Sequence, residues 1–136
     1  MGMGKAAELA RKRLPGYERK VRPLRDELEE GILRSIPNTE LNGHKTQRLA
    51  NTANITFHGI ESEALLILLD KEGICASSGS ACLADSDEPS HVIKAMKPSS
   101  AASRQMIRFS LDKGNSAVES KAALIALQQA TELLRM

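Results

Sequence analysis

Aromatic side chains are scarce in this sequence of 136 residues, which has no Trp, one Tyr and two Phe. Proteins that bind single-stranded nucleic acid commonly stack its bases on aromatic rings, and this chain lacks such a platform. Its charges offer no substitute, because 19 basic and 17 acidic residues leave a net charge of only +2. The composition therefore argues against a nucleic-acid partner and predicts a core of aliphatic side chains.

Long apolar runs and paired cysteines are missing as well. No tract is long and apolar enough to span a bilayer, and the amino terminus has no signal-peptide core. We therefore expect a cytoplasmic protein with no membrane partner. The two cysteines, Cys75 and Cys82, fit neither a disulfide framework nor the C-x-x-C spacing of a zinc or redox site.

The chain is long enough for one ordinary core, since 41% of its residues are hydrophobic. We expect a single small domain over residues 1–136, beginning with a long kinked helical segment over residues 1–36. Pro15-Gly16 should interrupt this segment, and Pro23 should bend the amphipathic stretch that follows. Its apolar face should pack on the sheet and on a Leu-rich helix at residues 64–69. The residues of this face are Tyr17, Val21, Leu24, Leu28 and Ile32.

Residues 37–136 predict an α/β core with about three short strands. Ile74–Ala76 is a short apolar run and is interpreted as a buried strand. A second strand or hairpin is expected between Leu49 and Phe57, and Met106–Ser110 alternates apolar and polar residues like a third. The expected fold class is α+β, a small, mainly antiparallel three-stranded sheet covered by helices.

Three further helices are expected to cover this sheet. The Leu-rich segment Glu61–Leu69 is too long for a strand, and Gly73 provides a helix-ending residue. A short helix should run from Pro89 to Met96, where Lys97-Pro98 ends it. Ser116 and Glu119 form an S-x-x-E capping box that should begin the last helix.

Residues 77–89 form the stretch around which the other motifs are arranged. The residues Ser77-Ser78-Gly79-Ser80 are small and without periodicity, so we expect a loop that presents Cys82. A single loop cysteine is usually just an exposed thiol, whereas Cys75, inside the apolar run, should be a buried small hydrophobe. Alternation alone would make Arg108 a strand arginine that faces solvent.

Three blocks carry a family resemblance: Ser77–Cys82, Glu88–Ile93 and Ile107–Leu111. In order and spacing they resemble the carboxy-terminal part of the cysteine desulfurases, most closely the nitrogen-fixation type. Gly2–Ala6 is also similar to the start of the helix that returns from the family's large domain. The resemblance implies the carboxy-terminal small domain of fold-type I, class-V aminotransferase-like enzymes. Asp112 departs from the family, which has glycine there.

The same resemblance implies a function. In these enzymes pyridoxal phosphate draws electrons from bound L-cysteine, and a protein thiolate takes the substrate sulfur as a persulfide, releasing L-alanine. Cys82 corresponds to that catalytic thiol, and Arg108 to the guanidinium that binds the substrate carboxylate. The sulfur is delivered to an iron–sulfur scaffold protein. Cys82 would also be a transient iron–sulfur ligand shared with that scaffold.

The resemblance also predicts what the chain lacks. The family's pyridoxal-phosphate-binding large domain, with its Schiff-base lysine and acid/base histidine, would lie upstream of these residues. We therefore expect a fragment that is inactive alone, holds no cofactor stably and belongs to a homodimeric enzyme. A stand-alone sulfur-carrier or adaptor module, which would use the same thiol without a cofactor, is the alternative.

Other polar residues predict no site. His44, His58 and His91 fall in an expected turn, a strand end and a helix start, and no metal-ligand spacing relates them. Asn51 and Asn54 are interpreted as turn or edge-strand amides.

Overall fold

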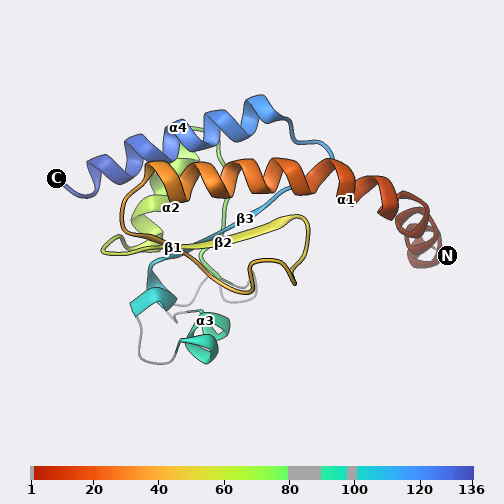
Figure 1. Ribbon diagram of the computed structural model, residues 1–136, viewed down its shortest axis with the longest axis horizontal. Coiled ribbons are helices and arrows are strands. Elements are labelled where there is room, and N and C mark those ends of the chain that lie inside the picture. The colour runs from red at the N-terminus through yellow and green to blue at the C-terminus, as the bar shows by residue number, and fades with distance from the viewer. Residues whose placement is uncertain (1, 80–89, 98–100) are drawn as a thin grey trace.

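The computed structural model describes residues 2–79, 90–97 and 101–136. Three helices cover one face of a sheet, namely α1 (Gly2–Ser35), α2 (Ser62–Lys71) and α4 (Ala117–Leu133). The short helix α3 (His91–Met96) lies on the opposite side of the sheet (Figure 1). Next to it is a 3-10 turn, η2 (Ala101–Arg104).

The sheet has three strands, β1 (Thr39–Leu41), β2 (Thr52–Phe57) and β3 (Met106–Ser110). They lie in the order β1-β2-β3, and both neighbouring pairs are antiparallel. The predicted fold class, an α+β domain with a small antiparallel sheet, is therefore confirmed. Strand β2 is the central strand, so the interpretation of Asn54 as an edge-strand amide is wrong.

One predicted strand is absent and another takes its place. Ile74–Ala76 forms no strand, and only the next residue, Ser77, makes an isolated antiparallel bridge, with Arg108. Instead β1 follows directly after α1, where Asn38 adopts a positive φ of 54° that reverses the chain. A strand of three residues is too short to show a period, so pairing with β2 defines it.

Helix α1 is continuous, so the predicted interruption at Pro15-Gly16 is wrong. Both Pro15 and Pro23 lie inside the helix. A proline removes one backbone hydrogen bond and pushes the preceding turn aside. Strong helix formers precede Pro15 and follow soon after Gly16, and the helix continues through both residues. The amino-terminal part of α1 bends away from the axis of the remainder (Figure 1).

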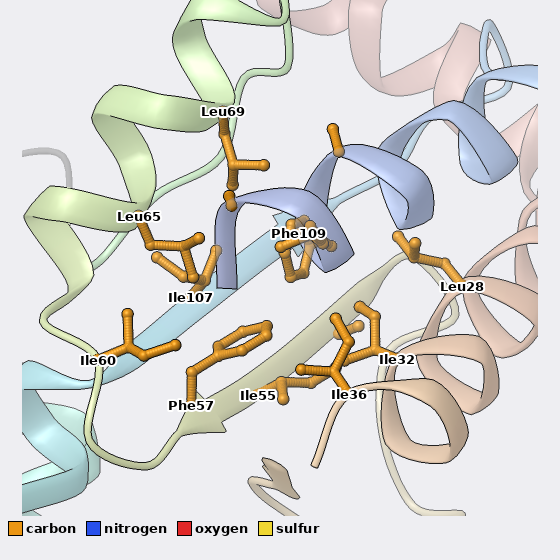
Figure 2. Close-up of a cluster of buried hydrophobic side chains, with 14 of the residues drawn as sticks. Leu28, Ile32, Ile36, Ile55, Phe57, Ile60, Leu65, Leu69, Ile107 and Phe109 are labelled. Carbon is orange, nitrogen blue, oxygen red and sulfur yellow. The ribbon is translucent and has the colours of Figure 1, made fainter. Parts of the chain in front are cut away.

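The predicted apolar face of α1 packs into the main core. Val21, Leu28 and Ile32 are buried, and Tyr17 and Leu24 are partly buried against the same cluster. Figure 2 shows side chains from α1, α2, β2 and β3 meeting between the helices and the sheet. The expected contact with the Leu-rich helix, α2, needs correction. Helix α1 packs mainly on α4 and to a lesser extent on β1 and β2, whereas α2 packs on α4 and β3.

The close contact between α1 and α4 explains a glycine in the middle of α1. A Cβ atom at Gly31 would lie 2.7 Å from Leu124 Cδ2 of α4. Any larger residue would therefore push Leu124 aside.

The expected helix signals are largely confirmed. The Ser116 side chain accepts a hydrogen bond from the Glu119 N–H, and the Glu119 carboxylate accepts one from the Ser116 N–H at 2.7 Å. Gly73, with φ of 73°, follows α2 as predicted. Ser90 caps α3 by accepting from the Ile93 N–H, whereas Pro89, the predicted start, lies outside the described residues.

Candidate functional site

The sheet has one apolar and one polar face. Alternate residues of β2 point into the helix-covered core, where Ala53, Ile55 and Phe57 are fully buried. The other residues of β2, Thr52, Asn54 and Thr56, face the opposite side, where Met106 of β3 packs with Ile93 and Ala102. The polar face therefore belongs to the same side of the sheet as α3 and η2.

Strand register places four polar residues in one row across this face. Asn54 of β2 is directly opposite Arg108 of β3. On the far side of β3, Arg108 is bridged by Ser77, and on the far side of β2 the Asn42 N–H donates to the Asn54 carbonyl at 2.8 Å. The row therefore runs Asn42, Asn54, Arg108, Ser77.

Arg108 is held to Ser77 by backbone and side chain together. The Arg108 N–H donates to the Ser77 carbonyl at 2.7 Å, and the Ser77 N–H donates to the Arg108 carbonyl at 3.2 Å. In addition, Arg108 Nη2 donates to Ser77 Oγ at 3.2 Å. The half-buried guanidinium is thus attached to the first residue of the predicted 77–89 loop.

The other end of the row is a buried amide cluster. Asn42 is 5% exposed, and its Nδ2 donates to Asn54 Oδ1 and to Thr56 Oγ1, each at 2.8 Å. Asn42 Oδ1 is buried without a hydrogen-bond partner in the described part of the chain. Reversing the Asn42 amide would place its oxygen against Asn54 Oδ1 and leave its two N–H donors buried without partners, so the present orientation is the less costly one.

That orientation fixes the amide beside Arg108. Since Asn54 Oδ1 accepts from Asn42, Asn54 Nδ2 faces Met106 Sδ at 3.6 Å. A thioether sulfur is a weak acceptor, so this amide keeps donor capacity on the polar face.

Arg108 differs electrostatically from Arg25 and Arg48, two other arginines that lie inward. Arg25 is paired with Asp26 at 2.6 Å, and Arg48 is paired with Glu29 at 2.7 Å. Within residues 2–79, 90–97 and 101–136, no Asp or Glu forms an ion pair with Arg108. Its neighbours in the row are a neutral hydroxyl and a neutral amide. A half-buried cation with neutral neighbours is suited to bind an anion.

The structure tests the prediction for one of the two cysteines, Cys75. Cys82, the predicted catalytic thiol, lies outside the described residues, as do residues 80–89 of the predicted loop. Cys75 is exposed, so the prediction of a buried thiol is wrong. Its neighbours Ile74 and Ala76 both pack against the core, and in an extended segment the residue between them points outward. Cys75 lines an open hollow of about 460 Å³ together with Phe109 and Ala123.

The histidines serve local structure. His44 Nδ1 accepts the backbone N–H groups of Thr46 and Gln47 at 3.1 and 2.9 Å. His58 Nε2 lies 3.2 Å from Glu40, and His91 is the first residue of α3. No group of three His, Cys, Asp or Glu residues in the described ranges could hold a metal ion. None of the described helices is both long enough and apolar enough to cross a membrane.

The described residues do not fit a pyridoxal phosphate site. A Schiff-base lysine must lie beside the cofactor in a desolvated setting. Every lysine in the described ranges is exposed except Lys97, which is paired with Glu40 at 2.6 Å. The hollow beside Cys75 has no lysine or arginine in its lining.

Comparison with known proteins defines the class. The profile of the class-V aminotransferases matches residues 1–122, and the chain belongs to this family. A NifS-like protein from Rickettsia africae superposes with a TM-score of 0.82 at 28% identity, over 96% of this chain and 33% of that one. A second NifS-like protein has the same fold, with a TM-score of 0.79 at 24% identity, over 95% of this chain and 32% of that one.

Within the class, curated relatives are cysteine desulfurases. Cysteine desulfurase 2 of Trichormus variabilis is 49% identical over 99% of this chain and 34% of its own length. The cysteine desulfurase NifS of Azotobacter vinelandii is 49% identical over 83% of this chain and 28% of its own length. The resemblance inferred from the sequence is thus confirmed, and the chain spans about a third of the length of these relatives.

Sequence reasoning missed Ser77 and Asn54 as neighbours of Arg108, and Asn42 as the next residue of the row. Ser77 was interpreted only as a loop residue, and Asn54 as a turn or edge-strand amide. The polar alternation of Thr52, Asn54 and Thr56 was a usable signal for a second, polar sheet face. The register that aligns Asn54 with Arg108 had no signal in the sequence.

Proposed function

We propose that this chain is the carboxy-terminal part of a cysteine desulfurase, to which it contributes the thiol of Cys82 and the guanidinium of Arg108. One observation carries the proposal: Arg108 is half-buried on the polar sheet face between neutral partners, with no carboxylate paired to it in the described residues. This is the electrostatic setting that a carboxylate substrate requires. The identity to cysteine desulfurases supports L-cysteine as that substrate.

Each of the two residues has a defined part in the proposed reaction. Arg108 binds the substrate carboxylate through parallel N–H donors, which fixes the orientation of L-cysteine. The Cys82 thiolate forms a bond to the substrate sulfur while the carbon–sulfur bond breaks. The carbon fragment keeps that electron pair, takes a proton and leaves as L-alanine, and Cys82 holds the sulfur as a persulfide. Pyridoxal phosphate belongs to a part of the enzyme beyond the residues described here.

The product and the setting follow from the same proposal. A persulfide on Cys82 delivers its sulfur to an iron–sulfur scaffold protein, including in nitrogen fixation. Cys82 also serves as a transient iron–sulfur ligand shared with that scaffold. The complete enzyme is a cytoplasmic homodimer. The family of the curated relatives does not favour the alternative, a stand-alone sulfur carrier.

The experiment uses the complete pyridoxal phosphate enzyme that contains this chain. Cys82→Ala should form no enzyme persulfide from L-cysteine. Arg108→Ala should raise KM for L-cysteine by roughly tenfold to a hundredfold, because a hydrogen bond to a charged group contributes about 1.5–3 kcal/mol. Arg108→Lys keeps the charge but loses the planar fork, so its KM should lie between those of the wild type and of Arg108→Ala.

Persulfide formation by Cys82→Ala, or an unchanged KM in Arg108→Ala, would refute the corresponding role. The sulfur-carrier alternative makes a separate prediction. A carrier without cofactor would accept sulfur from another persulfide with the same rate in Arg108→Ala as in the wild type, and its complete form would release no alanine from L-cysteine.

A further inference from the structure

The Ser77 hydroxyl lies at the junction between Arg108 and the segment that follows. Ser77 Oγ accepts from Arg108 Nη2 at 3.2 Å and from the Gly79 N–H at 3.3 Å, and it donates to the Gly79 carbonyl at 2.9 Å. A serine hydroxyl has one donor hydrogen and two acceptor lone pairs. All three are used here, so the oxygen is fixed in orientation and presents a lone pair to the guanidinium.

Among the described residues, Arg108 lacks the carboxylate partner that Arg25 and Arg48 have. Arg25 and Arg48 are held by carboxylates, which neutralise them. Ser77 holds Arg108 through a neutral oxygen, and Asn54, directly across on β2, is neutral as well. A carboxylate in place of Ser77 would compete with an anionic ligand for the same N–H groups, whereas a hydroxyl leaves the positive charge intact.

We propose that Ser77 is a positioning residue for the carboxylate site: its hydroxyl aligns the Arg108 guanidinium for the substrate carboxylate without neutralising it. The inference rests on the proposed function, and it deepens it by assigning the acceptor that orients the clamp. The contact uses one N–H of Nη2, so the remaining four N–H donors of the guanidinium stay available to the carboxylate.

A matched pair of variants isolates the hydroxyl. Ser77→Thr keeps the oxygen, and Ser77→Val has the shape of threonine with a methyl group in place of the hydroxyl. Ser77 is in an extended segment bridged to β3, where β-branched residues are well tolerated. Ser77→Ala is a third variant that adds no bulk.

The first measurement tests alignment in the 136-residue chain itself, with arginine labelled by 15N. NMR spectroscopy follows rotation of the Arg108 guanidinium, whose signal is assigned by its loss in Arg108→Lys. Wild type and Ser77→Thr should show slow rotation, and Ser77→Val and Ser77→Ala should show faster rotation. Equal rotation in all four proteins would overturn the proposal whatever the enzyme's activity.

The second measurement tests the carboxylate in the complete enzyme. Ser77→Val and Ser77→Ala should raise KM for L-cysteine about tenfold, as expected for a lost hydrogen bond to a charged group. Their kcat should change less than about twofold, because the clamp holds ground state and transition state alike. Ser77→Thr should behave like the wild type.

Cysteamine provides the control for a purely structural role. It has the amine and thiol of cysteine but no carboxylate, so its inhibition constant should be the same in all variants. If Ser77→Val weakens the binding of cysteamine as much as the binding of L-cysteine, the effect does not depend on the carboxylate. Ser77 then only supports the structure of the site, and the proposal is wrong. If the wild-type enzyme releases no alanine from L-cysteine, the proposed function fails. The positioning role then fails with it, and the NMR result shows only whether the hydrogen bond between Ser77 and Arg108 restrains the guanidinium.

Discussion

The buried ion pair between Glu29 and Arg48 should contribute strongly to the stability of the chain. Arg48 donates to both Glu29 carboxylate oxygens, at 3.2 and 2.7 Å, and each side chain is only 11% exposed. Arg48 also donates to the Thr52 carbonyl at 2.7 Å, and Arg25 donates to the Leu49 carbonyl at 3.0 Å. Together these contacts fasten the long β1–β2 connection to α1 and fix the start of β2.

The expected magnitude follows from burial. Removing one partner of a buried pair leaves the other charge uncompensated, which costs about 3–5 kcal/mol for full burial. Glu29 and Arg48 retain slight exposure, so Glu29→Met should destabilise the chain by about 3 kcal/mol. For a domain of this size that corresponds to a fall in Tm of roughly 10 °C. Arg48→Met should cost a similar amount.

The double variant Glu29→Met/Arg48→Met provides the decisive comparison. It buries no unpaired charge, so it should be more stable than either single variant. Urea unfolding followed by circular dichroism gives the three free energies of unfolding, and a constant m value shows that the denatured state is unchanged. Additive effects, or single variants within about 1 kcal/mol of the wild type, would show that solvent screens the pair and would refute the reasoning.

Two further predictions concern a surface ion cluster and an exposed thiol. A hydrogen bond from Lys97, then the nearby charge of Lys97 and contact with His58, hold the pKa of Glu40 below its ordinary value of 4.5 against the opposing effect of burial. The contribution of this ion cluster to folding stability is therefore present above the ordinary pKa and is lost as pH falls through the lowered pKa. Lys97→Met should raise the Glu40 pKa, measured by carboxyl 13C NMR, and an unchanged pKa would contradict this assignment. Cys75 should react with iodoacetamide in the folded chain almost as fast as in urea, as mass spectrometry of a Cys82→Ala variant can show, and strong protection would contradict its exposure.

Local signals in the sequence predicted the helices well because those signals act within a few residues. The Ser116 and Glu119 capping box and the glycine after α2 depend on neighbours three or four positions away. The apolar face of α1 was also predictable, because a helix repeats every 3.6 residues over its whole length. The same local reasoning failed at Pro15-Gly16, where the helix continues through two residues that both have low helix propensity.

The strands were predicted less well because pairing across the sheet defines them. Thr39–Leu41 is too short for any period to be recognised. It becomes strand β1 only by pairing with β2, which places Thr39 opposite Phe57 and Leu41 opposite Ile55. Ile74–Ala76 has the apolar content of a strand, yet it leaves Cys75 exposed and forms no ladder. Apolar content alone therefore does not distinguish a paired strand from an extended segment that packs one side on the core.

The candidate site shows the same limit most clearly. Arg108 could be predicted from a family resemblance, but its setting depends on three pairings between segments far apart in sequence: β1 with β2, β2 with β3, and Ser77 with β3. A shift of one residue in any of them would turn a polar side chain of the row to the core face. The buried Asn42 side chain makes such a shift costly, because its Nδ2 donates to both Asn54 and Thr56 only in this register. The amide cluster thereby fixes the alignment of β1 with β2, and the Asn54–Arg108 pairing carries that alignment to the guanidinium.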